Sequence, residues 1–105
     1  MKKYELRYLP LFFDDLAEKT DYIRYRLMNP EAADNLLDAV EEAILKRLEN
    51  PESFEPYESE RERKYTYYRI YVQKFIVYYV VIPGKPPVME VRRFLYKGQD
   101  RDNIV

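Results

Sequence analysis

The residues of this chain best suited to chemistry are basic side chains interleaved with tyrosines in its C-terminal part. A guanidinium or ammonium group can hold a phosphate, and a flat phenol ring can stack on a base. Such residues could take part in RNA cleavage or bind an anionic partner. The opposing interpretation is that the tyrosines are ordinary strand formers and the arginines ordinary surface charges. In chain order the candidates are Lys64, Tyr67, Arg69, Tyr71, Arg92, Arg93, Tyr96 and Lys97.

Composition removes several other kinds of chemistry. The 105 residues include no Cys and no His, so thiol nucleophiles, Ser-His-Asp triads and thiolate or imidazole zinc sites are excluded. We therefore expect neither a metal nor a cofactor, and the lack of Cys suits a reducing compartment. Two carboxylate pairs, Asp14-Asp15 and Glu41-Glu42, are interpreted as solvated helix faces, because neighbours in a helix point about 100° apart.

The charges divide along the chain, although the net charge is only -1. Residues 1–60 hold 8 Lys and Arg against 15 Asp and Glu, a balance of -7, whereas residues 61–105 hold 10 against 4, a balance of +6. One interpretation is that solvated helix faces are acidic. The other is that the C-terminal half presents a positive surface to a phosphate-rich or acidic partner.

The N-terminal half predicts one strand and two helices. Residues 4–9 alternate apolar and charged side chains, which is typical of a strand with one buried face. A helix over residues 11–28 follows Pro10, and Asn29-Pro30-Glu31 indicates the start of a second helix that ends at Asn50-Pro51. The short connection predicts an antiparallel hairpin. The expected apolar stripes are Phe13, Leu16, Thr20, Ile23 and Leu27 on the first helix, and Ala33, Leu36, Leu37, Val40, Ala43, Ile44 and Leu48 on the second.

The C-terminal half predicts strands. After a surface loop over residues 51–64, the apolar period changes to two, which indicates a strand over 65–72. Gln73-Lys74 is expected to form a tight turn, and residues 75–82 a strand buried on both faces at the sheet centre. A Pro-rich connector over 83–87 then leads to a last strand over 88–96.

Together these elements predict a single α+β domain over residues 1–105. An N-terminal strand, an antiparallel helix hairpin and a three-stranded antiparallel meander follow one another (β-α-α-β-β-β), with both helices against one sheet face. The longest apolar run, Phe75 to Ile82, has eight residues, far fewer than the roughly 20 that a membrane helix needs. The N-terminus does not resemble a signal peptide. We therefore expect a soluble, cytoplasmic protein with no membrane partner.

Alternation along the strands predicts which side chains lie opposite the helices. If Ile70 and Val72 point to the helices, then Tyr67, Arg69 and Tyr71 point away from them on an open face. In the last strand, alternation places either Arg92 or Arg93 near the rim of the core. The two expected faces of that strand are Met89, Val91, Arg93 and Leu95, and Glu90, Arg92, Phe94 and Tyr96.

Four segments, taken together and in their order along the chain, resemble those of a known group of proteins. They are Asn29-Pro30-Glu31-Ala32-Ala33 with Leu36, Ala43, Ile44 and Leu48, then Tyr68-Arg69-Ile70-Tyr71-Val72, Phe75-Ile76-Val77-Tyr78-Tyr79 and Val91-Arg92-Arg93-Phe94-Leu95-Tyr96. In this combination the chain resembles, over nearly its whole length, the RelE/ParE toxin superfamily of type II toxin-antitoxin (plasmid stabilisation) systems. The resemblance implies a growth-inhibiting toxin, held inactive in a hetero-oligomer by an antitoxin whose extended or helical C-terminal segment wraps it.

The resemblance also implies targets and candidate site residues. ParE-like members poison DNA gyrase, whereas RelE-like members cut mRNA in the ribosomal A site, and the fold does not separate the two. Arg69, Arg93, Tyr96 and Lys97 become the candidate catalytic residues. Lys64, Tyr67, Tyr71 and Arg92 become the candidate binding residues. A second register, which we favour, places Gly98-Gln99-Asp100 at the family's common C-terminal arginine-arginine-aspartate, and Ile76 stands where a basic residue is frequent.

The available side chains favour binding over cleavage. Cutting RNA with its own 2′-hydroxyl needs groups that remove and supply protons, and no side chain here has a naturally neutral pKa. We therefore predict a ParE-like toxin that binds gyrase. The alternatives are a metal-independent, ribosome-dependent mRNA endonuclease and a divergent relative that binds its antitoxin without being toxic. The positive half beyond residue 61 is expected to receive acidic residues of the antitoxin, and a groove between helices and sheet its apolar anchors.

Overall fold

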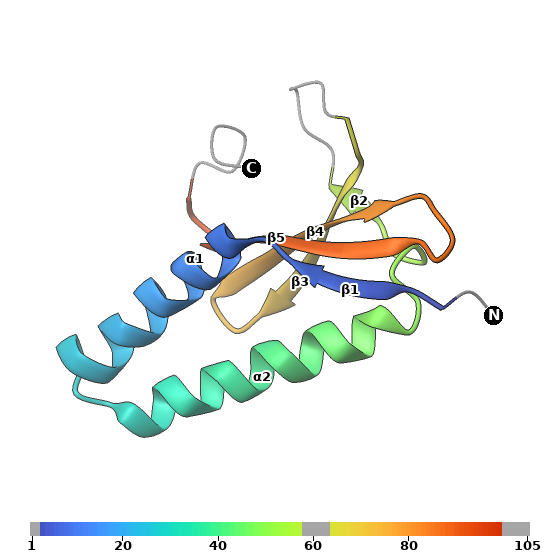
Figure 1. Cartoon of the computed structure of the whole chain (residues 1–105). Coiled ribbons are helices and arrows are strands. Elements are labelled where there is room, and N and C mark those ends of the chain that lie inside the picture. The colour runs from blue at the N-terminus through green and yellow to red at the C-terminus, as the bar shows by residue number, and fades with distance from the viewer. Residues whose placement is uncertain (1–2, 58–63, 100–105) are drawn as a thin grey trace.

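Within residues 3–57 and 64–99, which a computed structural model describes, the chain forms a five-stranded sheet and a helix hairpin (Figure 1). The predicted α+β class is confirmed, with one short strand added to the predicted order. The elements are β1 (Glu5–Tyr8), α1 (Pro10–Asp21), the π-helical turn η1 (Tyr22–Arg26), α2 (Pro30–Leu48), β2 (Pro56–Tyr57), β3 (Tyr67–Val72), β4 (Phe75–Ile82) and β5 (Val88–Tyr96).

The strands lie in the order β1-β5-β4-β3-β2. β3, β4 and β5 form the predicted antiparallel meander. In the predicted turn between β3 and β4, Gln73 has a φ of 54°, a left-handed conformation that suits a tight hairpin turn. β4 is the central strand and, as predicted, its first six residues are buried. β1 pairs in parallel with β5 and so forms one edge of the sheet.

The loop predicted over residues 51–64 contains a strand that the sequence did not reveal. Pro56 and Tyr57 form β2, which pairs with Tyr68 and Tyr67 of β3. A strand of two residues is too short to show an alternation of apolar and polar side chains, so the sequence pattern could not predict it. Residues 58–63 of the predicted loop lie outside the described residues.

α2 follows its sequence signals closely. The Oδ1 atom of Asn29 accepts a hydrogen bond from the Ala32 backbone N–H at 3.0 Å, and Pro30 lies in the first turn. This cap satisfies one of the N–H groups that a helix start leaves without an internal partner. The centre of the predicted stripe is confirmed, because Ala33, Leu36, Val40 and Ile44 are buried. In the described parts of the chain, no helix has the length and apolar character that crossing a bilayer demands.

The inward side of α1 agrees only in part with the predicted one, because Thr20 is buried and Leu16 and Ile23 pack against the core. Phe13 and Leu27 are exposed, and the helix predicted over 11–28 becomes π-helical at Tyr22 and ends at Arg26. The reason is that α1 packs beside β5 (Figure 1), whose pairing with β1 stops at Val91. The edge of β5 beyond that point presents polar backbone groups, so polar side chains of α1 turn inward. The buried residues of α1 are Phe12, Asp15, Lys19 and Thr20.

The main core lies between the helices and one face of the sheet, and we call it the helix-side core. Its buried members are Phe12, Leu36, Val40, Ile44, Ile70, Val72, Phe75, Val77, Tyr79, Met89, Val91 and Phe94. Tyr79 is the one residue of this list with a hydroxyl. That hydroxyl donates to the Pro51 carbonyl at 2.7 Å and accepts from Nη1 of Arg47 at 2.9 Å. It therefore ties the end of α2 to the sheet.

Replacing Tyr79 with phenylalanine should lower the free energy of unfolding by about 1–2 kcal/mol, because a buried carbonyl and a guanidinium lose a partner. Burial raises the pKa of Tyr79, with the hydrogen bond from Arg47 acting in the opposite direction, and burial also raises the pKa of Tyr8 and of Tyr68. The unfolded chain then loses these phenol protons first. The contribution of these tyrosines to the free energy of unfolding should be fully present below about pH 10 and should decrease above it. The decrease should be less steep in Tyr79→Phe.

Urea unfolding across this pH range measures both effects. Tyr25→Phe is the matched control, because Tyr25 is exposed and its substitution should leave the stability unchanged. An alkaline slope that is equal in the wild type and Tyr79→Phe would show that the Tyr79 hydroxyl does not contribute to it.

Candidate functional site

The face of the sheet turned away from the helices, which we call the second face, carries most of the predicted basic and aromatic residues. Tyr67 belongs to its hydrophobic cluster, whereas Ile70 and Val72 belong to the helix-side core, so the predicted alternation of β3 is confirmed. The second face is not simply open, however. Tyr71 is 55% exposed but Tyr67 only 7%, because this face has apolar packing of its own. That cluster consists of Tyr67, Ile76, Tyr78, Val80 and Leu95, with Tyr57, Tyr65 and Ile82 packed against it.

β5 contains a β-bulge in the middle of this surface. The register shifts between Tyr78 and Tyr79, whose partners on β5 are Arg93 and Val91. Arg92 is therefore an extra residue that faces no partner on β4. A bulge of this kind bends its strand and changes where side chains point.

The bulge makes the predicted alternation of β5 wrong beyond Val91. Phe94 packs in the helix-side core together with Met89 and Val91, while Leu95 lies in the cluster of the second face. The expectation that one of the two arginines lies near the rim is met by Arg93, whose partner is on α1.

Arg92 is held on the second face by several contacts, which we call the Arg92 cluster. Its Nε donates to Oε1 of Glu90 at 2.8 Å and its Nη1 donates to the Tyr67 hydroxyl at 3.1 Å. Its guanidinium carbon lies 5.8 Å from the ring centre of Tyr65, and Nζ of Lys64 lies 5.4 Å from the same ring. These are attractive cation–π distances. Three predicted binding residues, Lys64, Tyr67 and Arg92, thus come together.

A second group on this face, the Arg69 cluster, contains the other predicted binding residue. The guanidinium carbon of Arg69 lies 5.0 Å from the ring centre of Tyr57 and 5.7 Å from that of Tyr71. Nζ of Lys97 lies 5.5 Å from the Tyr71 ring centre. Because Tyr71 and Lys97 are exposed, this cluster offers a charged, aromatic surface to a partner. It joins two predicted catalytic residues, Arg69 and Lys97.

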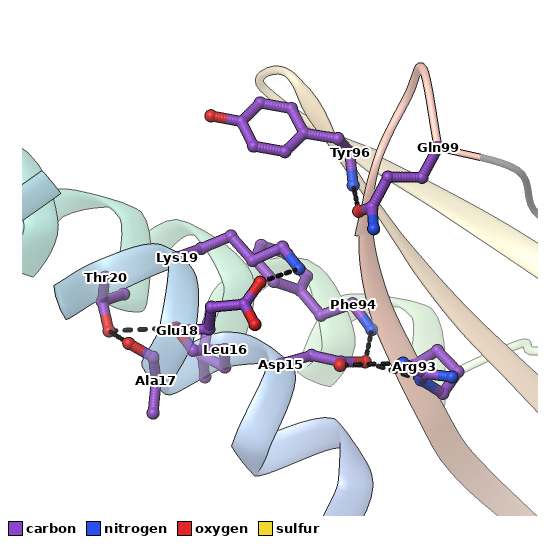
Figure 2. Close-up of polar contacts among 10 residues, drawn as sticks. All are labelled: Asp15, Leu16, Ala17, Glu18, Lys19, Thr20, Arg93, Phe94, Tyr96 and Gln99. Carbon is purple, nitrogen blue, oxygen red and sulfur yellow. Dashed lines mark hydrogen bonds and ion pairs between the residues drawn. The ribbon is translucent and has the colours of Figure 1, made fainter. Parts of the chain in front are cut away.

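Arg93 is bound to α1 at the edge of β5 (Figure 2). Its Nε and Nη2 donate to the two carboxylate oxygens of Asp15 at 2.7 and 2.9 Å. The same carboxylate accepts the backbone N–H of Phe94 at 3.0 Å, at a point that β1 no longer covers. The hydrogen bonds to Asp15, opposed in part by burial, raise the pKa of the Arg93 guanidinium. Arg93 is therefore a fixed positive charge, and not a group that exchanges protons.

Tyr96 lies at the end of β5 beside α1. Its ring centre is 4.7 Å from that of Phe75, and its backbone N–H donates to Oε1 of Gln99 (Figure 2). Tyr96 also lines a cavity together with Glu18 and Lys19 of α1 and Tyr22 of η1. The four predicted catalytic residues are thus divided: Arg69 and Lys97 share the Tyr71 ring, whereas Arg93 and Tyr96 face α1. Their catalytic roles stay predictions.

Residues 6–101 match the family described as the ParE toxin of type II toxin-antitoxin system, parDE. The chain belongs to the ParE toxin family. A comparison with curated proteins finds no match. Membership in a type II system gives this ParE-family chain a cognate antitoxin as partner.

The favoured alignment of the family's C-terminal ending is only partly visible in this ParE-family chain. Gly98 and Gln99 follow β5, and the side chain of Gln99 holds the Tyr96 backbone, while Asp100 lies outside the described residues. Among residues 3–57 and 64–99, no three acidic side chains gather where a metal ion could bind.

Two carboxylates of this ParE-family site were missed by the sequence analysis. Asp14, Glu41 and Glu42 are exposed as predicted, but Asp15 is buried against Arg93, so its interpretation as a solvated side chain is wrong. Glu90 is also buried and holds Arg92. The spacing from Phe12 to Asp15 continues to Lys19 in helical steps of three and four, and a charged residue at such a position was the available signal.

Proposed function

We propose that this ParE-family toxin inhibits DNA gyrase by binding it, through the Arg69 and Arg92 clusters of the second face. The observation that supports this most is the way the arginines are held. Arg92 is fixed by Glu90 and Tyr67, and the Arg69 guanidinium lies against the ring of Tyr57, 5.0 Å from its centre. Pre-organised charges and tyrosine rings favour recognition of a partner, because little side-chain entropy is lost on binding. General acid or base catalysis instead needs groups that titrate near neutral pH.

Purified chain tested against purified gyrase decides this proposal. We expect negative supercoiling of relaxed plasmid to stop in the absence of ribosomes, with half-inhibition shifted about tenfold or more by Lys97→Glu, because a charge reversed in a recognition surface repels the partner. Lys46→Glu on α2 is the control, since Lys46 is exposed and α2 packs on the opposite face of the sheet from these clusters.

Two other outcomes identify the alternatives. Ribosome-dependent mRNA cleavage that Tyr96→Phe abolishes, with gyrase unaffected, would assign the chain to the endonuclease class. Induction that leaves growth unchanged would indicate a divergent relative that only binds antitoxin. Either result contradicts gyrase inhibition.

The antitoxin is proposed to use both the charge and the apolar surface of this chain. A cavity of about 410 Å³ between α1 and α2 is lined mainly by apolar side chains, and two of them, Phe13 and Leu45, are exposed. Such a groove suits the apolar face of a helical segment. Acidic residues of the same antitoxin would then meet the Arg69 cluster.

Charge reversal at Arg69 should weaken the antitoxin complex about tenfold at low salt and less at high salt, because exposed charges are screened. Arg69 is preferable to Arg93 for this experiment, since a negative charge at 93 would oppose Asp15 and disturb the fold. Titration calorimetry at two salt concentrations measures the change, with Lys46→Glu as control. An affinity loss that salt does not alter would contradict an electrostatic contact.

A further inference from the structure

Lys19 of α1 is a buried lysine beside a cavity. Its side chain is only 5% exposed, and the cavity, of about 310 Å³, is lined by Glu18, Lys19, Tyr22 and Tyr96. An ammonium group carries three N–H donors. Within the described part of the chain, its ion-pair partner is Glu18, at 3.2 Å between Nζ and Oε1 (Figure 2). The ammonium therefore has donors left for a ligand in the cavity.

Glu18 is a partner that an incoming group can displace. Glu18 and Lys19 are neighbours in a helix, where adjacent side chains do not face each other, so helix geometry does not favour this pair. The Glu18 side chain is 77% exposed, and an ion pair with such a solvated member is worth little. The nearby Asp15 carboxylate is engaged elsewhere, because it accepts two hydrogen bonds from Arg93 and one from the Phe94 backbone.

We propose that the Lys19 cavity binds the carboxylate of an Asp or Glu side chain of the cognate antitoxin. One ammonium charge matches one carboxylate charge, whereas a phosphate dianion would bring excess negative charge next to Glu18. The half-exposed rings of Tyr22 and Tyr96 provide hydroxyl donors and apolar surface for the methylene stem of the acidic side chain. The inference rests on the antitoxin as partner and not on gyrase as target.

The chemistry of the cavity can be tested with acetate as the probe. The lysine side chains are labelled with ¹³C at Cε, and sodium acetate replaces sodium chloride at constant ionic strength. The Lys19 resonance should move and saturate, while the resonance of the exposed Lys46 should not. Glu18→Gln should tighten acetate binding severalfold, because the internal competitor is gone. Equal responses at Lys19 and Lys46, an unchanged affinity in Glu18→Gln, or tighter binding of inorganic phosphate would overturn the proposal.

The identity of the ligand is tested on the complex with the cognate antitoxin. The Lys19 resonance should no longer respond to acetate in this complex, since the antitoxin fills the cavity. Lys19→Met, which keeps the buried stem, should weaken the complex by roughly tenfold to a hundredfold, and Lys46→Met should leave it unchanged. A Lys19 signal that still titrates with acetate in the complex overturns the inference, whether or not Lys19→Met folds. Gyrase that stays active would contradict the proposed target alone.

Discussion

Asp15→Ala should be among the most destabilising single substitutions in this protein, lowering the free energy of unfolding by about 3 kcal/mol. The carboxylate binds two nitrogens of Arg93 and the Phe94 backbone N–H. The side chains of Arg93 and Asp15 are only 17% and 10% exposed. Removing Asp15 leaves a largely buried guanidinium and a strand N–H without this partner. Solvent reaches Arg93 enough to keep the loss at the lower end of the range for buried pairs.

Urea unfolding compares Asp15→Ala with two other variants. Asp14→Ala removes the same charge from the exposed neighbour and should change stability by less than about 0.5 kcal/mol. Asp15→Asn keeps an oxygen that can accept from Phe94 but loses the ion pair, so it should fall between the two. If Asp15→Ala and Asp14→Ala unfold at the same urea concentration, the contact with Arg93 contributes nothing.

This ion pair also affects how Arg93 can be tested for catalysis. Arg93→Ala leaves Asp15 buried with one partner fewer, so lost activity could reflect unfolding. A double-mutant cycle with Asp15→Ala should show a coupling of about 2 kcal/mol, because the two side chains act as one unit. Loss of mRNA cleavage in Arg93→Ala but not in Asp15→Ala would indicate a role beyond stability, whereas equal loss in both would indicate a structural role.

The elements with a clear periodicity could be predicted from the sequence. α2 has a strong cap at Asn29 and a continuous apolar stripe, and both are as expected. β3 alternates as predicted. The apolar run of β4 lies at the sheet centre, as expected for a strand whose two faces are both covered and whose side chains can therefore all be apolar. The candidate residues of the second face also followed from the alternation of β3.

The remaining features depend on contacts between distant parts of the chain. The bulge at Arg92 is set by pairing with β4, and a strict period of two cannot show where a residue is added. Asp15 is inward because β1 ends and leaves the edge of β5 open. Glu90 is buried because Arg92 holds it across the bulge. Asp15 is satisfied by a partner from another element, and Glu90 by the bulged arginine of its own strand, and a local pattern reports neither contact.

Arg92→Ala should be comparably destabilising, by about 2–3 kcal/mol, because it removes the main partner of a buried carboxylate. Glu90 accepts from Arg92 at 2.8 Å, and its side chain is 7% exposed. Glu90 also pairs with Arg7 of β1, whose Nη1 is 3.3 Å from its Oε2, but the Arg7 side chain is 53% exposed, so solvent weakens that contact. Arg7→Ala is therefore the matched control, with an expected change below about 1 kcal/mol.

Neutralising the carboxylate should reverse much of this loss. In the double variant Glu90→Gln and Arg92→Ala no buried charge is left without a partner, so its unfolding free energy should lie closer to the wild type than that of Arg92→Ala. A double variant no more stable than Arg92→Ala would assign the loss to packing against Tyr65 and Tyr67 instead. The double variant also separates stability from recognition. If it folds well but no longer inhibits gyrase, Arg92 itself contacts the target, because the fold of the second face is then intact while its central charge is gone.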